Sequence, residues 1–231
     1  ALSQQRLFEF RMGERSPDTL VVTEANRRAA DLLTQWRTWP GGALALVGPG
    51  GSGKTHLALA WALETGARQI SPTAAPDDGA DIFAEAQGRV LIDNADGARD
   101  EAMFWRVLDM ARSQGGAVLL AGAGAPSNWA VSLPDLKSRL LALPVARLEE
   151  PDEALLSVVL RRLCREQFIH LSDKGAKYLV ERMPRTFAAA RDVVAALDSG
   201  LAKGPRPVGP MIARKALEQA QAGWGEAAGD G

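Results

Sequence analysis

The amino-acid sequence predicts an α/β domain with a parallel sheet, followed by a smaller all-helical domain. Short apolar runs alternate with helix-like patterns before Pro151, as expected when neighbouring strands are parallel and helices cover both faces of their sheet. After Pro151 the apolar residues recur only at helical spacing. A chain of 231 residues, of which 46% are hydrophobic, is long enough to build both cores.

The α/β domain contains four runs that are apolar and too short for helices, and each is predicted to be a strand. These runs are 43–47, 89–93, 117–121 and 144–150. Helices are expected at 24–38, 56–63 and 101–113, with a loop at 72–80. The first helix has an apolar face that we expect to be buried, made of Ala25, Ala29, Leu32 and Trp36.

The second domain is predicted to be a bundle of helices at 152–167, 172–183, 185–201 and 208–221. The first of them carries apolar residues at helical spacing, including Leu156, Leu160 and Leu163. The predicted organisation is an extended arm at 1–16, the α/β domain at 17–150, the helical domain at 151–222 and a flexible tail at 223–231.

Composition excludes several classes of protein. The formal net charge of −1 argues against a chain that coats nucleic acid non-specifically. The single cysteine, Cys164, cannot form an internal disulfide, which favours a reducing, cytoplasmic location. No apolar run reaches about 18 residues, and the N-terminus lacks a secretory signal, so neither a membrane span nor secretion is expected.

Charge is unevenly distributed between the two predicted domains. The segment from Arg161 to Lys215 holds 12 basic and 5 acidic residues, a net charge of +7, whereas the rest of the chain carries −8. Two explanations fit this division of charge: either the charges lie on solvated helix faces, or the basic domain closes over a polyanionic ligand.

The most specific motif is GPGGSGKT, which spans Gly48 to Thr55 and fits G-x-x-x-x-G-K-[ST] at every required position. It lies between a predicted strand and a predicted helix, where backbone N–H groups converge on phosphate oxygens. Lys54 would reach the β- and γ-phosphates, and Thr55 would bind Mg²⁺. The residues assigned to this nucleotide site are Gly48, Pro49, Gly50, Gly51, Ser52, Gly53, Lys54 and Thr55. His56 is added because it follows Thr55 directly, although packing is its favoured role.

A second metal ligand is expected at the end of the strand RVLID, where Asp93 supplies a carboxylate. Two neighbouring positions are less suited to hydrolysis. Asn94 follows Asp93 where many ATPases of this kind have an acid, and an amide cannot take up the proton of the attacking water. The strand 117–121 is followed by Gly122 and Ala123, without a polar side chain. The sequence thus predicts nucleotide binding with poor hydrolysis.

Several segments resemble the initiator branch of the AAA+ superfamily. LVVTEANRRA (20–29) is similar to the entry motif of DnaA-type domains, in which two valines, here Val21 and Val22, lie by the adenine. LPDLKSRL (133–140) resembles the Box VII segment and would place an arginine finger at Arg139. MPRTFAAARDV (183–193) resembles the sensor 2 helix and would place its arginine at Arg185.

The resemblance implies a P-loop AAA+ fold, with a five-stranded parallel sheet, a helical lid and ADP or ATP with Mg²⁺ as ligands. The chain ends near the expected end of the lid, without room for the helix-turn-helix domain of DnaA, so the pattern is most similar to the Hda family of DnaA-related regulators. This family promotes ATP hydrolysis by DnaA. The alanine at the sensor 1 position departs from the family, which has an aspartate there.

The N-terminal arm contains QQRLF, which fits the sliding-clamp motif Q-x-x-L-F. Gln4 would fill a small polar pocket of the DNA polymerase III sliding clamp, and Leu7 and Phe8 would enter a hydrophobic one. Burial of two large apolar side chains can contribute about 1.5–3 kcal/mol each. The expected partners are therefore DnaA and the clamp.

Two other functions remain open from the sequence. A helicase loader of the same superfamily would use the basic lid on single-stranded DNA and a replicative helicase, and a P-loop kinase would need an acceptor site that we cannot assign. Homo-oligomers are also left open, and contact with duplex DNA is expected to be indirect at most. His170 and Cys164 lack partners at metal-ligand spacing, so a separate metal site is not expected.

Overall fold

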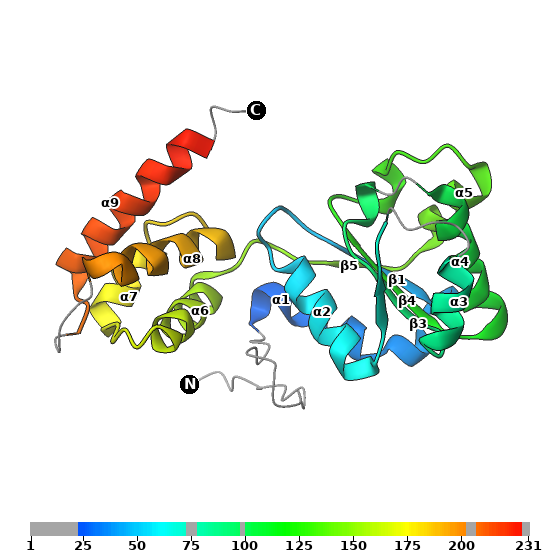
Figure 1. Cartoon of the computed structure of the whole chain (residues 1–231), viewed down its shortest axis with the longest axis horizontal. Coiled ribbons are helices and arrows are strands. Elements are labelled where there is room, and N and C mark those ends of the chain that lie inside the picture. Colours follow the sequence, from blue (N-terminus) through cyan, green and yellow to red (C-terminus); the bar gives the residue numbers. More distant parts are fainter. Residues whose placement is uncertain (1–22, 73–77, 98–99, 202–206, 228–231) are drawn as a thin grey trace. The chain divides into compact units, whose positions relative to one another are not determined.

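The computed structural model describes residues 23–72, 78–97, 100–201 and 207–227 (Figure 1). The chain divides after Glu149 into two compact units, each with its own core. Within the described residues, no helix is long and apolar enough to cross a membrane.

The first unit is built on a five-stranded parallel sheet with the strand order β2-β3-β4-β1-β5. Its strands are β1 Ala43–Val47, β2 Arg68–Ile70, β3 Arg89–Ile92, β4 Ala117–Gly122 and β5 Val145–Arg147. The predicted parallel α/β sheet is confirmed. The residue pattern missed only β2, because this short edge strand has just one buried residue, Ile70.

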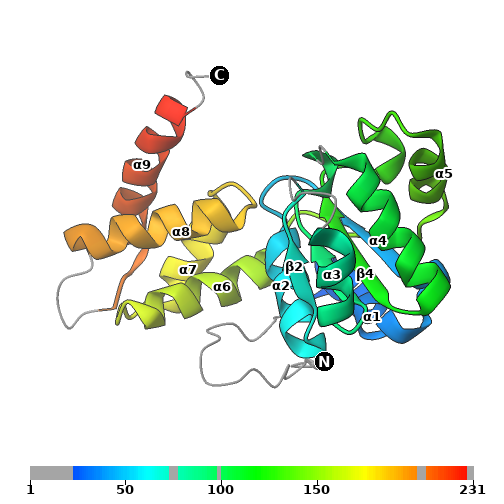
Figure 2. The same cartoon turned by 45° about the vertical axis from the view of Figure 1, so that its right-hand side comes forward.

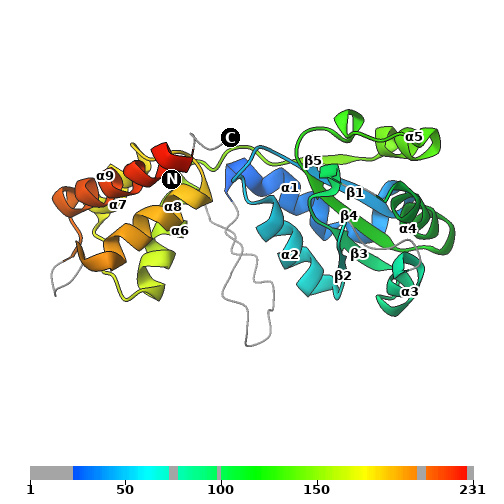
Figure 3. The same ribbon diagram turned by 45° about the horizontal axis from the view of Figure 1, so that its top comes forward.

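Helices cover both faces of the sheet, as Figure 3 shows. They are α1 Glu24–Thr34, α2 Lys54–Thr65, α3 Asp78–Glu85, α4 Glu101–Gln114 and α5 Pro134–Ala142. Successive side chains of a strand point to opposite faces, so Leu44 and Leu46 pack in the core with α1 and α2. Ala43, Ala45 and Val47 belong to the other core, with α3, α4 and α5.

The first helix differs from its prediction. It ends at Thr34, and a separate 3₁₀ turn follows at Trp36–Thr38. Its buried residues are Asn26, Ala29, Ala30 and Leu33, so the buried face is rotated from the predicted one. Asn26 is buried because its side chain accepts the N–H of Thr23 at 2.8 Å and closes the first turn, a role that hydrophobic periodicity does not detect.

The second unit is called the lid, and its described residues, 150–201 and 207–227, are helical apart from loops and one isolated bridge between Leu171 and Val208 (Figure 2). Its helices are α6 Glu153–Glu166, α7 Asp173–Val180, α8 Phe187–Ala196 with a π-helical turn at Leu197–Leu201, and α9 Pro210–Ala227. Side-chain oxygens of Asp152, Ser172 and Thr186 accept N–H groups at the starts of α6, α7 and α8. These caps explain where the helices begin.

The flexible tail predicted from residue 223 is wrong for its first residues, because α9 continues to Ala227. Trp224 packs against the lid core, and its indole N–H donates to the Asp192 carboxylate at 2.7 Å. This long-range contact holds the last turns of α9 despite the glycines around them.

Candidate nucleotide-binding site

The glycine-rich loop joins the fully buried strand β1 to α2. Gly51 and Gly53 have φ angles of 74° and 91°, which L side chains rarely adopt, so glycine suits both positions. Gly53 also caps α2, whose first residue is Lys54. The loop therefore presents the N-terminus of a 12-residue helix at the carboxyl edge of the sheet, where anions are favoured.

Gly48 has a steric reason to be glycine. A Cβ there would lie 2.7 Å from the carbonyl oxygen of Leu148 and 2.9 Å from Oγ of Ser52. The N–H of Leu148 also donates to the carbonyl of Val47 at 2.7 Å. The start of the loop is thus packed against the chain that leaves β5, which sets the position of the loop.

The polar groups inside the loop fit a phosphate ligand. The Lys54 ammonium donates to the carbonyl oxygens of Gly48 and Pro49 at 2.8 Å each, which holds the cation against the loop. Ser52 is buried, and its hydroxyl has no hydrogen-bond partner among the described residues. Because an unsatisfied buried hydroxyl is unfavourable, a ligand oxygen that accepts from it would stabilise the loop.

A cavity of about 360 Å³ adjoins the start of the loop. It is lined by Val47, Gly48, Pro49, Ala123, Gly124, Arg147, Leu148 and Glu149. Arg147, on β5, brings a cation to this edge of the sheet, and sequence reasoning missed it. No motif marks it, and only the pairing of β5 with β1 places it beside the loop.

The predicted metal ligands lie on neighbouring segments. Asp93 follows β3 directly and is only 8% exposed, whereas Thr55 is exposed in the first turn of α2. Mg²⁺ is commonly held by one or two protein oxygens together with phosphate oxygens and water, so these two residues fit it. Among the described residues, no group of three or more His, Cys, Asp or Glu side chains could hold a metal by itself.

Asn94 has a role in the local backbone structure. Its φ angle is 55°, in the left-handed region that asparagine tolerates better than most residues, and its N–H donates to the Asp93 carboxylate at 3.0 Å. The side chain is exposed. This turn orients Asp93, and the asparagine supplies no general base for water.

The end of β4 shows why Gly122 carries no polar side chain. A Cβ at Gly122 would lie 2.8 Å from a carboxylate oxygen of Asp96 and 2.8 Å from the Trp129 ring. The Trp129 indole N–H donates to the carbonyl of Ala123 at 2.9 Å and so fixes the ring. Asp96 is a second acidic group at this edge, and sequence reasoning missed it because it follows no strand directly.

Arg139, the predicted arginine finger, lies on α5 and is engaged within its own chain. Its guanidinium forms an ion pair with Asp109 of α4 at 2.6 Å and lies over the ring of Trp105, 5.3 Å from the centroid. The two charged side chains are 23% and 33% exposed. Arg139 would have to leave Asp109 before it could reach a phosphate on another molecule.

The start of α5 is held by Glu101 of α4. Its carboxylate accepts the N–H groups of Ser132 and Leu133 at 2.7 and 2.6 Å and the Ser132 hydroxyl at 3.0 Å. These bonds, first those from the two backbone N–H groups, hold the pKa of Glu101 below its usual value. Glu101 therefore fixes the helix that carries Arg139.

We expect Glu101→Ala to lower the melting temperature at neutral pH, because α5 loses its acceptor. Since the folded-state pKa is depressed, this stabilisation is present above the unfolded pKa and is lost as the pH falls through the folded value. Thermal melts of both proteins between neutral and acidic pH should therefore converge on acidification. Glu85→Ala, which removes an exposed ion pair with Arg68, serves as the control. A difference in melting temperature that stays constant with pH would contradict this role.

The remaining predicted residues are described one by one. Arg185 lies before α8 in the lid and pairs with Glu153 at 3.1 Å, with both side chains about half exposed. His56 is exposed on α2. Val21, Val22, Gln4, Leu7 and Phe8 lie outside the described residues.

Comparison with known proteins gives a structural likeness only, since no protein-family model and no curated sequence matches the chain. Domain III of the Thermotoga maritima replication initiation protein DnaA superposes with a TM-score of 0.68 at 17% identity, over 86% of this chain and 93% of that one. AMPPCP-bound DnaA from Aquifex aeolicus gives 0.62 at 18% identity, over 91% and 69% of the two chains.

A Thermotoga maritima RuvB Holliday junction branch migration motor is also similar, with a TM-score of 0.61 at 20% identity, over 77% of this chain and 61% of that one. Together with the strand order and the helical second unit, these likenesses show that the chain has a DnaA-like AAA+ fold.

Proposed function

We propose that the protein is a nucleotide-bound regulator of DNA replication initiation, similar to the Hda family. In this proposal it holds ADP or ATP with Mg²⁺ in the glycine-rich loop, binds the sliding clamp through its N-terminal arm, and promotes ATP hydrolysis by DnaA through Arg139. Its own turnover is slow, and its nucleotide chiefly shapes the interface with DnaA.

The observation that carries the proposal is that the glycine-rich loop has the groups that bind a nucleotide, whereas Asn94 and Gly122 lack the groups that hydrolysis needs. Lys54, Ser52 and Asp93 suit the binding of a nucleotide and its metal. Asn94 and Gly122 supply neither a general base nor a polar sensor. A site that binds without efficient turnover suits a regulator better than a motor.

The likeness to DnaA supports adenine nucleotide as the ligand, since the Aquifex aeolicus protein was solved with AMPPCP. Arg139 supports an action on a neighbouring molecule, because in AAA+ assemblies the corresponding segment points into the neighbour's site. A guanidinium placed there stabilises charge that develops on the transferring phosphoryl group.

The deciding experiment measures ATP hydrolysis by DnaA with and without this protein, in the presence of clamp loaded on DNA. We expect hydrolysis to accelerate only when protein and loaded clamp are both present. Equal hydrolysis in all mixtures would refute the proposal.

A helicase loader is the second candidate, favoured by the basic lid, and pull-down of a replicative helicase in place of the clamp would support it.

The arm gives a separate prediction. Replacing Gln4, Leu7 and Phe8 with alanine should abolish clamp binding, because each would lose its pocket, while the melting temperature stays unchanged. Surface plasmon resonance on immobilised clamp measures the first effect, and a thermal melt measures the second. As a control, alanine at Gln5 and Arg6 should preserve binding. If the triple variant binds the clamp as tightly as the parent, the match of QQRLF to the clamp motif is accidental.

A further inference from the structure

The helix α6 ends in a turn of unusual composition. The N–H of Phe168 donates to the carbonyl of Arg165 at 3.0 Å, and the N–H of Ile169 donates to that of Cys164 at 2.7 Å. This is the Schellman pattern, in which the first residue beyond the C-cap adopts a left-handed conformation and is usually glycine. Here that residue is Phe168, with a φ angle of 56°.

Phe168 is also 98% exposed, so its ring makes almost no contact with the lid. A bulky residue is strained in the left-handed region, and an exposed phenyl ring gains nothing from burial. The fold would be served better by glycine at this position. Strain that the fold does not need is a sign of function at the residue that bears it.

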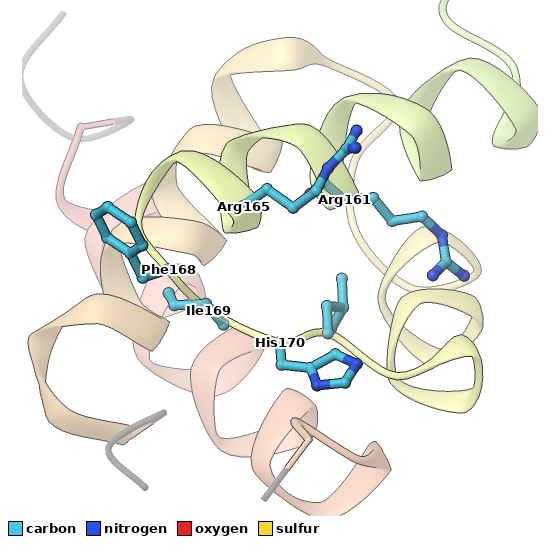
Figure 4. Close-up of a pocket in the computed structure, with 6 residues that line it drawn as sticks. Arg161, Arg165, Phe168, Ile169 and His170 are labelled. Atoms are coloured by element: carbon cyan, nitrogen blue, oxygen red, sulfur yellow. The ribbon is translucent and has the colours of Figure 1, made fainter. Parts of the chain in front are cut away.

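Two cationic side chains line the same cavity as Phe168. Arg161 and Arg165 are four residues apart and therefore lie on one face of α6. Together with Phe168, Ile169, His170 and Leu171 they line a cavity of about 520 Å³. In Figure 4 the arginines extend from α6, His170 lies on the segment after it, and the Phe168 ring points away from the helices.

The two arginines differ in their pairing. Arg161 forms an ion pair with Asp173 at 2.9 Å, and that carboxylate is 94% exposed. Arg165 has no carboxylate partner in the described part of the chain, where its Nε–H donates weakly to the carbonyl of Arg161 at 3.4 Å. One guanidinium is therefore open to an external anion, and the other is held only by an exposed carboxylate.

We propose that Phe168, Arg161 and Arg165 form a binding site for single-stranded nucleic acid. An exposed aromatic ring offers a face on which an unpaired base can stack, and adjacent arginines contact the phosphates on either side. The net charge of +7 between Arg161 and Lys215 draws the polyanion to the lid. The site is independent of the nucleotide loop and of any action on DnaA.

The test measures fluorescence anisotropy of a labelled oligothymidylate with the full chain at low salt. Phe168→Gly should weaken binding about fivefold or more, because stacking is lost, and should raise the melting temperature by about 2–4 °C, because the strain is relieved. Phe168→Trp should keep the affinity. Arg165→Ala should also weaken binding and flatten its salt dependence.

Arg214→Ala is the matched control, because Arg214 is an exposed arginine of α9 outside the cavity, and it should change the affinity less than about twofold. The duplex form of the oligonucleotide should bind more weakly, since its bases are stacked already. Equal affinity for the duplex or for polyglutamate would overturn the assignment in favour of a general polyanion or an acidic protein. The assignment would also be overturned if Phe168→Gly raised the melting temperature but left the affinity for the oligonucleotide unchanged.

Discussion

Replacing Lys54 with alanine is expected to weaken the binding of ATP and ADP by about 100-fold or more. The Lys54 ammonium is held inside the loop by the carbonyl oxygens of Gly48 and Pro49, at the N-terminus of α2. Its removal takes away the positive charge nearest to the phosphates and leaves the loop carbonyls facing them. Isothermal titration calorimetry with Mg²⁺ measures the loss.

Lys137→Ala is the matched control for this variant, because Lys137 is an exposed lysine of α5 in the same unit. It should bind nucleotide like the unaltered protein. Both variants should melt at the temperature of the parent without nucleotide, and only the parent and Lys137→Ala should gain stability when nucleotide is added. Nucleotide affinity that survives Lys54→Ala would place the ligand elsewhere.

Replacing Arg139 with alanine should remove the acceleration of ATP hydrolysis by DnaA, a loss of about 10³-fold or more if the residue acts as fingers do in GTPases. Nucleotide and clamp binding should be unchanged, because α5 contributes neither loop nor arm. The measurement is the rate of DnaA-bound ATP hydrolysis with loaded clamp. Arg112→Ala, on the exposed side of α4, should keep the full acceleration.

The ion pair with Asp109 refines this prediction. If Arg139 must leave Asp109 to act, Asp109→Asn should raise the acceleration up to about fivefold, since a partly exposed pair is worth about 1 kcal/mol at most. A loss as large as that of Arg139→Ala would mean instead that Asp109 positions the finger. Full acceleration by Arg139→Ala would move the active arginine to another residue.

Sequence patterns located the strands that are buried on both faces, because such strands are short, continuous apolar runs. The boundaries of β1 match the prediction, and those of β4 differ by one residue. The exposed edge strand β2 left no such pattern. The predicted face of α1 included Ala29 but missed Asn26, Ala30 and Leu33. Asn26 was missed because a hydrogen bond, not hydrophobicity, brings its side chain inside.

The position of the glycine-rich loop between β1 and α2 was predictable because its sequence signal is local: consecutive residues supply the glycines, the lysine and the start of the helix. The contacts that decide how Arg139 and Gly122 behave were not predictable, since they join distant segments. Asp109 is 30 residues from Arg139, and Asp96 and Trp129 flank Gly122 from different loops. Such pairings depend on the packing of α4, α5 and the strand ends.

The crowding around Gly122 decides how this chain could be redesigned as an ATPase. A polar side chain at position 122 would collide with Asp96 and with a ring that its own hydrogen bond holds in place. Ala123, by contrast, is exposed and lines the cavity beside the loop. A polar residue that senses the γ-phosphate could therefore be introduced at position 123 without a clash. The same change at position 122 would require compensating replacements on two other segments.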